Sequence, residues 1–158
     1  MIRNKILTLA ATVLLLAGCS STSGNGGADG MGANGVGQAA PGTQADLVQN
    51  VGDRVFYATD SSTLSPDARA ILDRQAAWLA KYETVRLTVE GHADERGTRE
   101  YNLALGERRA TAARNYLVAK GVAANRVSTI SYGKERPEVL GSTDEAWARN
   151  RRGVSVVQ

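Results

Sequence analysis

The hydrophobic and polar positions of residues 53–158 alternate between two periods, one typical of strands and the other of helices. Residues 54–58 predict a short strand. A helix is predicted over residues 66–82, because Ser65 can cap its first turn, proline suits the first helical position and Asp67 favours the positive end of the helix dipole. The apolar side chains of this helix recur at spacings of three and four, as one buried stripe requires: Ala68, Leu72, Ala76 and Leu79.

A second strand and a second helix follow. Residues 85–90 alternate apolar and polar side chains and predict a half-buried strand. A polar loop over residues 92–99 leads to a helix that ends at Gly121, a residue type that commonly ends helices. The small members of this helix would let it lie close to a sheet. Its predicted buried stripe consists of Leu103, Gly106, Ala110, Ala113 and Leu117.

After Gly121 the chain predicts three shorter elements. Residues 127–132 predict a strand, residues 143–152 a short helix and residues 154–157 a final strand. Strands and helices therefore alternate over the whole of residues 53–158. Such alternation favours an α/β fold of the α+β type, a two-layer sandwich in which helices cover one face of a single sheet.

The first 18 residues have the pattern of an export signal. A basic start precedes an apolar run over residues 6–17, which is too short to span a bilayer as a helix. Cys19 follows in the sequence LAGC, which resembles the site at which bacterial lipoproteins are cleaved and acylated. We therefore expect lipid attachment at Cys19, and two or more acyl chains make a stable membrane anchor. The alternative is a signal peptide whose cysteine has no role. By resemblance to other lipoproteins, Ser20 implies transfer to the outer membrane.

Residues 20–52 contain nine glycines and only two charged side chains, Asp29 and Asp46. Such a segment cannot bury enough apolar surface to offset the entropy lost on ordering. We expect a flexible tether over residues 19–52, with its lipidated cysteine first and the folded domain beginning at residue 53. About 33 residues of this composition reach at most about 110 Å.

Composition excludes several classes of function. The chain has 158 residues, with 19 basic and 16 acidic side chains, and a net charge of +3 is too slight to predict a nucleic-acid partner. One cysteine excludes an intramolecular disulfide. One histidine excludes a histidine-rich metal site.

From residue 53 onward the chain resembles the OmpA-like domain family, and in particular its lipid-anchored, peptidoglycan-binding members. The resemblance rests on VEGHADERGTREYNLALGERRA, YGKERP and the late NRR, together with LAGC. It implies a β-α-β-α-β-(α)-β sandwich that binds the meso-diaminopimelate of the peptidoglycan stem peptide without catalysis and without a cofactor or metal. It also implies the periplasmic partner TolB and other Tol proteins, a periplasm-facing domain that links the outer membrane to the cell wall, and a role in envelope integrity and constriction at division.

The resemblance also assigns a ligand site. Asp94 of GHADERGT matches the family's ligand-binding aspartate, and Arg109 of LGERRA matches its ligand-binding arginine. Meso-diaminopimelate carries an ammonium and a carboxylate on one carbon, so an acid and a planar basic fork suit it. Asn102 lies seven residues before Arg109, on the same helical stripe, and either orients the loop or contacts ligand. We expect Asp94 and Arg109 near the surface, so that their alanine variants fold.

One position departs from the family. In many relatives the first strand ends in Phe-Asp and this aspartate contacts ligand, whereas the same register here reads Tyr57-Ala58. Tyr57 keeps the aromatic position in the site, and Asp60 is a candidate replacement for the acid. Either Arg151 or Arg152 of the NRR motif braces the site, and the sequence leaves open which arginine does so; we assign Arg151.

Two other readings compete with a binding site. His92, Asp94 and Glu95 suggest a metal or acid-base group, but one histidine favours a loop histidine bonded to backbone. Adjacent Asp94 and Glu95 do not flank a glycosidic bond as hydrolysis requires. The alternative function, which the sequence leaves open, is a tethered cell-wall hydrolase or amidase.

We predict that Cys19→Ser abolishes acylation and releases the protein into the soluble periplasmic fraction, because the sequence has no other apolar run that would hold it at a membrane. Cell fractionation of the two forms, with circular dichroism to confirm folding, measures this. A Cys19→Ser chain that still sediments with outer membranes stripped of peptidoglycan would show that the anchor lies elsewhere.

Overall fold

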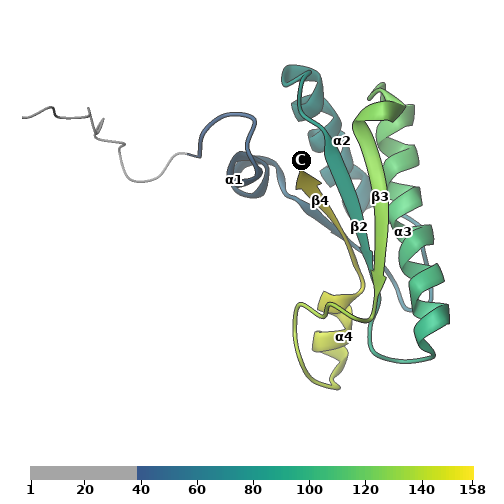
Figure 1. The fold of residues 1–158 in the computed structure, drawn as a ribbon. Coiled ribbons are helices and arrows are strands. Elements are labelled where there is room, and N and C mark those ends of the chain that lie inside the picture. Colours follow the sequence, from purple (N-terminus) through teal and green to yellow (C-terminus); the bar gives the residue numbers. More distant parts are fainter. Residues whose placement is uncertain (1–38) are drawn as a thin grey trace, which may run out of the picture. The chain divides into compact units, whose positions relative to one another are not determined.

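The frame of the domain is a four-stranded mixed sheet with the strand order β1-β4-β2-β3 (Figure 1). The computed structural model describes residues 39–158; the predicted signal peptide, Cys19 and the glycine-rich residues 20–38 lie outside this range. Parallel pairing joins β2 to β3, whereas β4 runs antiparallel to both β1 and β2. The strands are β1 (Arg54–Phe56), β2 (Leu87–His92), β3 (Val127–Gly133) and β4 (Arg152–Val157).

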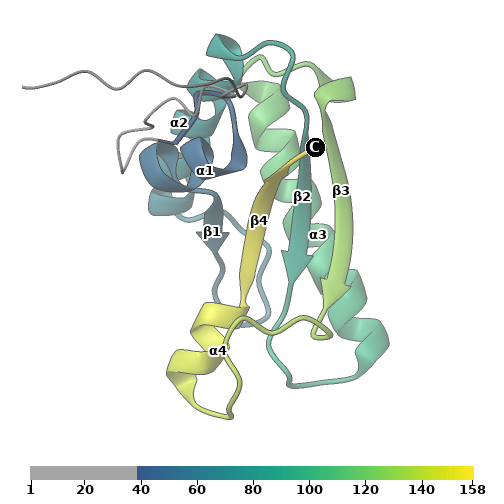
Figure 2. The ribbon, with the colours of Figure 1, turned by 60° about the vertical axis from the view of Figure 1, so that its left-hand side comes forward.

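Two long helices, α2 (Pro66–Lys81) and α3 (Arg99–Ala119), lie on one side of this sheet (Figure 2). The predicted two-layer α/β sandwich is therefore confirmed. Helix α2 begins where the sequence indicates, because the Ser65 hydroxyl accepts a hydrogen bond from the Ala68 amide at 3.1 Å. A 3₁₀ turn, η2 (Ala124–Arg126), precedes β3, and the short helix α4 (Asp144–Asn150) precedes β4. Among residues 39–158 no helix has both the length and the apolar character to cross a membrane.

The core between the layers confirms the buried stripe of α2 but corrects that of α3. All four predicted residues of α2 are buried. In α3, Leu103 is 43% exposed, and Leu105 is the leucine that packs inward. The apolar pattern misplaced the stripe because the buried face of α3 also contains two polar side chains, Asn102 and Arg109. These two residues define the site described below.

The folded domain includes residues before the expected boundary at residue 53. A helical turn, α1 (Gln44–Asp46), continues as a π-helical turn, η1 (Leu47–Val51). The side chain of Leu47 is fully buried in the core. Residues 44–52 therefore belong to the domain, although glycine-rich composition assigned them to the tether. The signal that the composition hid is one apolar side chain, Leu47, on a turn that Thr43 caps.

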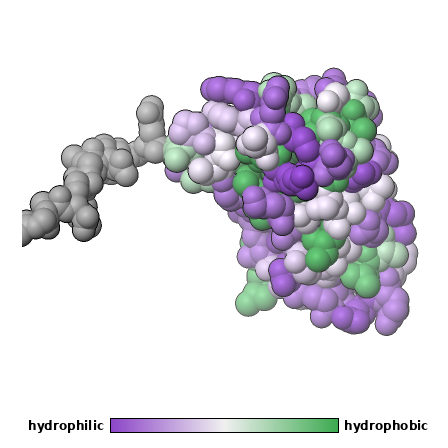
Figure 3. Space-filling view, turned by 45° about the horizontal axis from the view of Figure 1, so that its top comes forward, coloured by the Kyte–Doolittle hydropathy of each residue, from purple (hydrophilic) through white to green (hydrophobic). Residues whose placement is uncertain are grey.

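Helix α3 approaches β2 closely because glycines face each other across the layers. An added Cβ at Gly91 would overlap the carbonyl oxygen of Gly106. Within residues 39–158 no helix covers the other face of the sheet, which exposes Phe56 (42%) and Ile130 (39%). On the face seen in Figure 3, apolar residues form small separate groups among polar ones.

We predict that Gly91→Ala destabilises the domain by about 3 kcal/mol, at the upper end of the usual cost of overpacking, because the obstacle is backbone. Gly153→Ala is the matched control: it lies in the same sheet, and its added Cβ would meet its nearest atoms at 3.5 Å, an ordinary contact. Urea unfolding of both variants measures the difference. Equal midpoints would show that α3 does not depend on this close approach.

Candidate functional site

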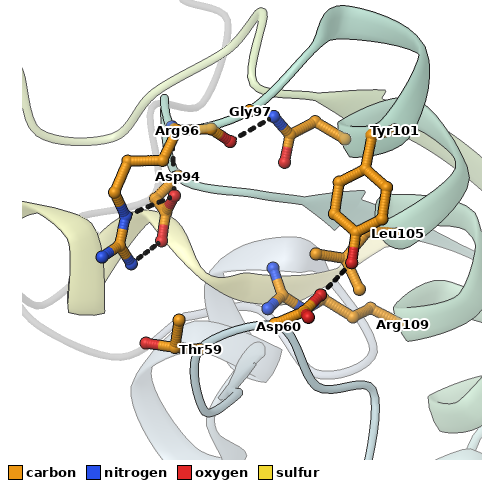
Figure 4. A pocket seen from close by; sticks show the side chains of 9 residues that line it. Thr59, Asp60, Asp94, Arg96, Gly97, Tyr101, Leu105 and Arg109 are labelled. Carbon is orange, nitrogen blue, oxygen red and sulfur yellow. Dashed lines mark hydrogen bonds and ion pairs between the residues drawn. The ribbon is translucent and has the colours of Figure 1, made fainter.

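A cavity of about 320 Å³ lies at one end of the sheet, where two loops meet the start of α3. One loop connects β1 to α2, and the other connects β2 to α3. Charged and polar side chains from both loops and from α3 point into the cavity (Figure 4). They include Asp60, Asp94, Arg96, Tyr101, Asn102 and Arg109.

Arg109 is the largest fully buried side chain among the described residues. Its Nε donates to the carbonyl of Ser61 at 2.8 Å, and its two terminal nitrogens donate to the carbonyls of His92 at 2.8 Å and Ala58 at 3.0 Å. Within residues 39–158 no carboxylate forms an ion pair with it. Since a guanidinium has five N–H groups, two of them have no hydrogen-bond partner among the described residues.

Three backbone carbonyls therefore solvate the charge of Arg109 directly, and the carboxylates of Asp94 and Asp60 stabilise it from farther away without forming an ion pair. Burial disfavours the charged form and lowers the pKa of Arg109 to about 10. This pKa is still well above 7, so the guanidinium is positive at neutral pH. A buried cation with free N–H groups at the wall of a cavity is suited to bind an anion, and a carboxylate fits its planar fork.

Asp94 is also buried, with 6% of its surface exposed. Arg96 holds its carboxylate with two donors, Nη2 at 2.6 Å and Nε at 3.1 Å, and Arg151 Nη1 lies 3.4 Å away. Burial alone would raise the pKa of Asp94, but the hydrogen bonds from Arg96 outweigh it and lower the pKa below its ordinary value. Asp94 is therefore ionised at neutral pH.

The structure distinguishes the two arginines of the NRR motif. Arg151 Nε donates to the carbonyl of Tyr57 at 3.1 Å, so Arg151 lies beside the cavity with Asp94. Arg152 Nε instead lies 3.0 Å from a carboxylate oxygen of Glu138. Arg151 lies in the turn between α4 and β4, whereas Arg152 is the first residue of β4, and only Arg151 reaches the site.

Asn102 and Tyr57 hold the backbone around the cavity in place through hydrogen bonds to its carbonyls. The Asn102 amide donates to the carbonyls of Arg96 at 2.7 Å and Thr98 at 3.0 Å, and so it fixes the loop that carries Asp94. The Tyr57 hydroxyl donates to the carbonyl of Arg109 at 2.8 Å. Its ring lies 5.3 Å from the guanidinium carbon, and burial raises the pKa of Tyr57.

The loop between β1 and α2 contributes to the cavity although residue 58 is alanine and not an acid. Ala58 provides its carbonyl to Arg109. Asp60, two residues later, adopts a left-handed conformation with φ of 52° and lines the cavity, where the Tyr101 hydroxyl donates to its carboxylate (Figure 4). Asp60 therefore brings a second carboxylate to the cavity. The sequence analysis missed Tyr101 and Arg96; both lie within the motif GHADERGTREYN, which was their only signal.

His92 and Glu95 do not join this group. His92 is the last residue of strand β2 rather than a loop residue, and its buried ring lies against Tyr132 with 5.6 Å between the centroids. The predicted position of His92 in the loop is therefore wrong. Glu95 accepts a hydrogen bond from the Trp147 indole. No three His, Cys, Asp or Glu side chains gather as a metal site within the described range.

The expectation that Asp94 and Arg109 lie near the surface is also wrong, since both are buried. Removing the Arg109 side chain would leave three buried carbonyls without their donor, so Arg109→Ala is not expected to fold normally. Substitutions that keep the shape of the group are needed to test it.

Comparison with known proteins identifies the domain in which this cavity lies. A profile of the OmpA family matches residues 56–151. The peptidoglycan-associated lipoprotein of Rhizobium meliloti (strain 1021) is 54% identical over 156 residues, covering 98% of this chain and 88% of that protein. The protein of the same name from Mesorhizobium japonicum is 51% identical over 155 residues, covering 98% and 92%.

A crystal structure of the peptidoglycan-associated lipoprotein from Burkholderia pseudomallei has a TM-score of 0.67 and 36% identity, and the match covers 72% of this chain and all of that chain. The fold and the cavity define a two-layer α/β domain with a cavity at one end that charged side chains line. The chain belongs to the OmpA family.

We predict that Asp94→Asn destabilises the domain at pH 7 by about 1.5 to 3 kcal/mol, the range of hydrogen bonds to charged groups. Because its pKa is lower in the folded chain than in the unfolded one, ionised Asp94 stabilises the fold above pH about 4, and this contribution is lost as the pH falls through the folded pKa. Urea unfolding from pH 7 to pH 2 should show the two forms converging.

Glu83→Gln is the control for this titration, because Glu83 is exposed and forms no ion pair among the described residues. It should leave stability nearly unchanged at every pH. A stability difference between wild type and Asp94→Asn that stays constant down to pH 2 would contradict the assigned role of the Asp94 charge.

Proposed function

We propose that this protein binds peptidoglycan non-covalently through the meso-diaminopimelate of the stem peptide. The observation that carries the proposal is the buried guanidinium of Arg109, which has no ion pair among the described residues and faces a cavity that also holds two carboxylates. A zwitterionic ligand supplies an anion for Arg109 and a cation for Asp94 and Asp60. Its carboxylate then binds the two free N–H groups of Arg109, and its ammonium binds Asp94 and Asp60.

The other cavity residues have supporting roles in this proposal. Asn102 holds the loop of Asp94 in place, Tyr57 holds the backbone of Arg109, and Arg151 braces Asp94 from the side. Arg96 balances the charge of Asp94 when no ligand is bound. The ammonium of the ligand takes over that balance, while Arg96 keeps its contact with the Trp147 ring, 4.2 Å from its guanidinium carbon.

The names of the relatives support the cellular setting. They are called peptidoglycan-associated lipoproteins, which agrees with acylation at Cys19, an outer-membrane location and a domain that faces the periplasm. In this proposal residues 20–41 form the tether, because the chain is anchored to the domain from about residue 42. Roughly 22 residues reach about 75 Å when stretched, less than the 33 residues first assigned would reach.

The same relationship supports TolB and other Tol proteins as partners, and with them a role in envelope integrity and outer-membrane constriction at division. Acylated Cys19 is the proposed contact with the lipid, and the stem peptide is the proposed contact with the wall. No cofactor is needed for either contact.

We predict that a stem peptide with meso-diaminopimelate binds at least about tenfold more tightly than the same peptide with lysine, because lysine lacks the carboxylate that Arg109 would bind. Asp94→Asn and Asp60→Asn should each weaken binding of the diaminopimelate peptide about tenfold to a hundredfold. Calorimetric titration measures each affinity.

Arg109→Lys and Arg108→Lys are a matched pair, since the arginines are adjacent but only Arg109 lines the cavity. The first should lose binding and the second should not. Equal binding of the lysine and diaminopimelate peptides would refute the assigned ligand. Release of soluble muropeptides from peptidoglycan incubated with purified protein would instead support the alternative, a wall hydrolase or amidase.

A further inference from the structure

Residues 42–52, which precede β1, contact both helix α2 and strand β4. We call this segment the N-terminal clasp. The Asp46 carboxylate accepts hydrogen bonds from the Trp78 indole at 2.9 Å and from the Gly42 amide at 2.8 Å. Leu47 is fully buried, and the carbonyl of Gly52 accepts a hydrogen bond from the Gln75 amide at 2.7 Å. The clasp is therefore attached to helix α2.

Gln44 attaches the clasp to the sheet as well. The paired residues of β1 and β4 end at Arg54 and Val154, and one more backbone hydrogen bond follows, from the Ser155 amide to the carbonyl of Asp53 at 2.7 Å. Beyond this bond, that side of β4 has no strand partner among the described residues. The Gln44 side chain occupies this place: its amide donates to the carbonyl of Ser155 at 3.3 Å, and its oxygen accepts from the Val157 amide at 2.7 Å. One side chain thus replaces the pairing of a short strand.

The clasp and the cavity lie at opposite ends of the sheet. Helix α1 lies beside the end of β4 at which the chain terminates, whereas α4 and the loops around the cavity lie at the other end (Figures 1 and 2). The six residues of β2 alone separate the two ends by about 20 Å. If the N-terminus is held at a membrane and the cavity holds the wall, tension between them runs along the strands.

Strand β1 is the weak part of that path. It pairs over only three residues, at an edge of the sheet. The loop that follows it provides the carbonyls of Ala58 and Ser61 that hold Arg109. Tension that reached β1 directly would therefore pull on the backbone that shapes the cavity.

We propose that the N-terminal clasp carries the tension applied through the tether and transfers it to α2 and to β4 before it reaches β1. The ligand site then keeps its geometry while the protein is pulled. The direction of the tension in this inference rests on the proposed function. The attachment of the clasp to the domain can be measured without ligand.

The test applies force to the unacylated mature chain through Cys19, its only cysteine, while a bead carries the diaminopimelate stem peptide. Gln44→Ala removes the two hydrogen bonds to β4. We expect its affinity without force to stay within twofold of wild type. Under force applied through Cys19, the peptide should dissociate about tenfold faster from Gln44→Ala than from wild type, because two hydrogen bonds are missing.

Two controls isolate the clasp. Pulling through Gln158→Cys in a Cys19→Ser background applies the force to β4 directly, so that Gln44→Ala and Gln44 chains should then release the peptide equally fast. Tyr116→Phe removes a hydrogen bond to Asp73 on the helix layer, away from the clasp, and should behave as wild type in both geometries. Equal peptide lifetimes for Gln44→Ala and wild type under force through Cys19 would overturn the proposal.

A second measurement separates this proposal from the proposed function. If the peptide does not bind without force, the proposed function fails, and the clasp is then tested alone by pulling between Cys19 and Glu100→Cys, an exposed position at the start of α3. Opening of the clasp should release about 35 Å of chain before global unfolding, at a lower force in Gln44→Ala. Equal opening forces in the two chains would overturn the inference independently.

Discussion

The buried positive charge of Arg109 is the constraint on which the site and much of the surrounding backbone depend. A charge removed from water is costly unless polar groups replace its solvation. Three carbonyls do so here, and they come from two places in the chain: Ala58 and Ser61 in the loop after β1, and His92 at the end of β2. Arg109 therefore ties α3 to that loop and to the end of β2, from which the second loop of the cavity begins.

The close packing of α3 against β2 places this charge where it is needed. Gly91 and Gly106 let the two backbones approach, and Arg109 follows one turn after Gly106 on the same buried face. A larger residue at either glycine would move the helix away from the sheet. The carbonyl of His92 would then no longer lie within hydrogen-bond distance of the guanidinium. The small residues of α3 thus contribute to the electrostatics of the site as well as to packing.

Sequence patterns predicted the layers, the order of elements and the caps, because these depend on local periodicity and on residue types that favour one conformation. The clasp was not predicted, since its attachment relies on contacts of Gln44 with residues more than 100 positions away. Leu103 was misplaced because a stripe defined by apolar residues omits a buried arginine. The pairing of Asp94 with Arg96, and the choice of Arg151 over Arg152, depend on loop and strand geometry that spacing does not encode.

The charges of Asp94 and Arg109 in the cavity are balanced in different ways. Asp94 forms an ion pair with Arg96, whereas Arg109 has carbonyl partners and no ion pair among the described residues. The proposed ligand, with ammonium and carboxylate on one carbon, would replace Arg96 as the partner of Asp94 and would give Arg109 a carboxylate partner. The gain in binding would then come mainly from the guanidinium, whereas the exchange at Asp94 would substitute one cation for another. This asymmetry favours zwitterions over simple amines, because an amine alone would compete with Arg96 and leave Arg109 as it was.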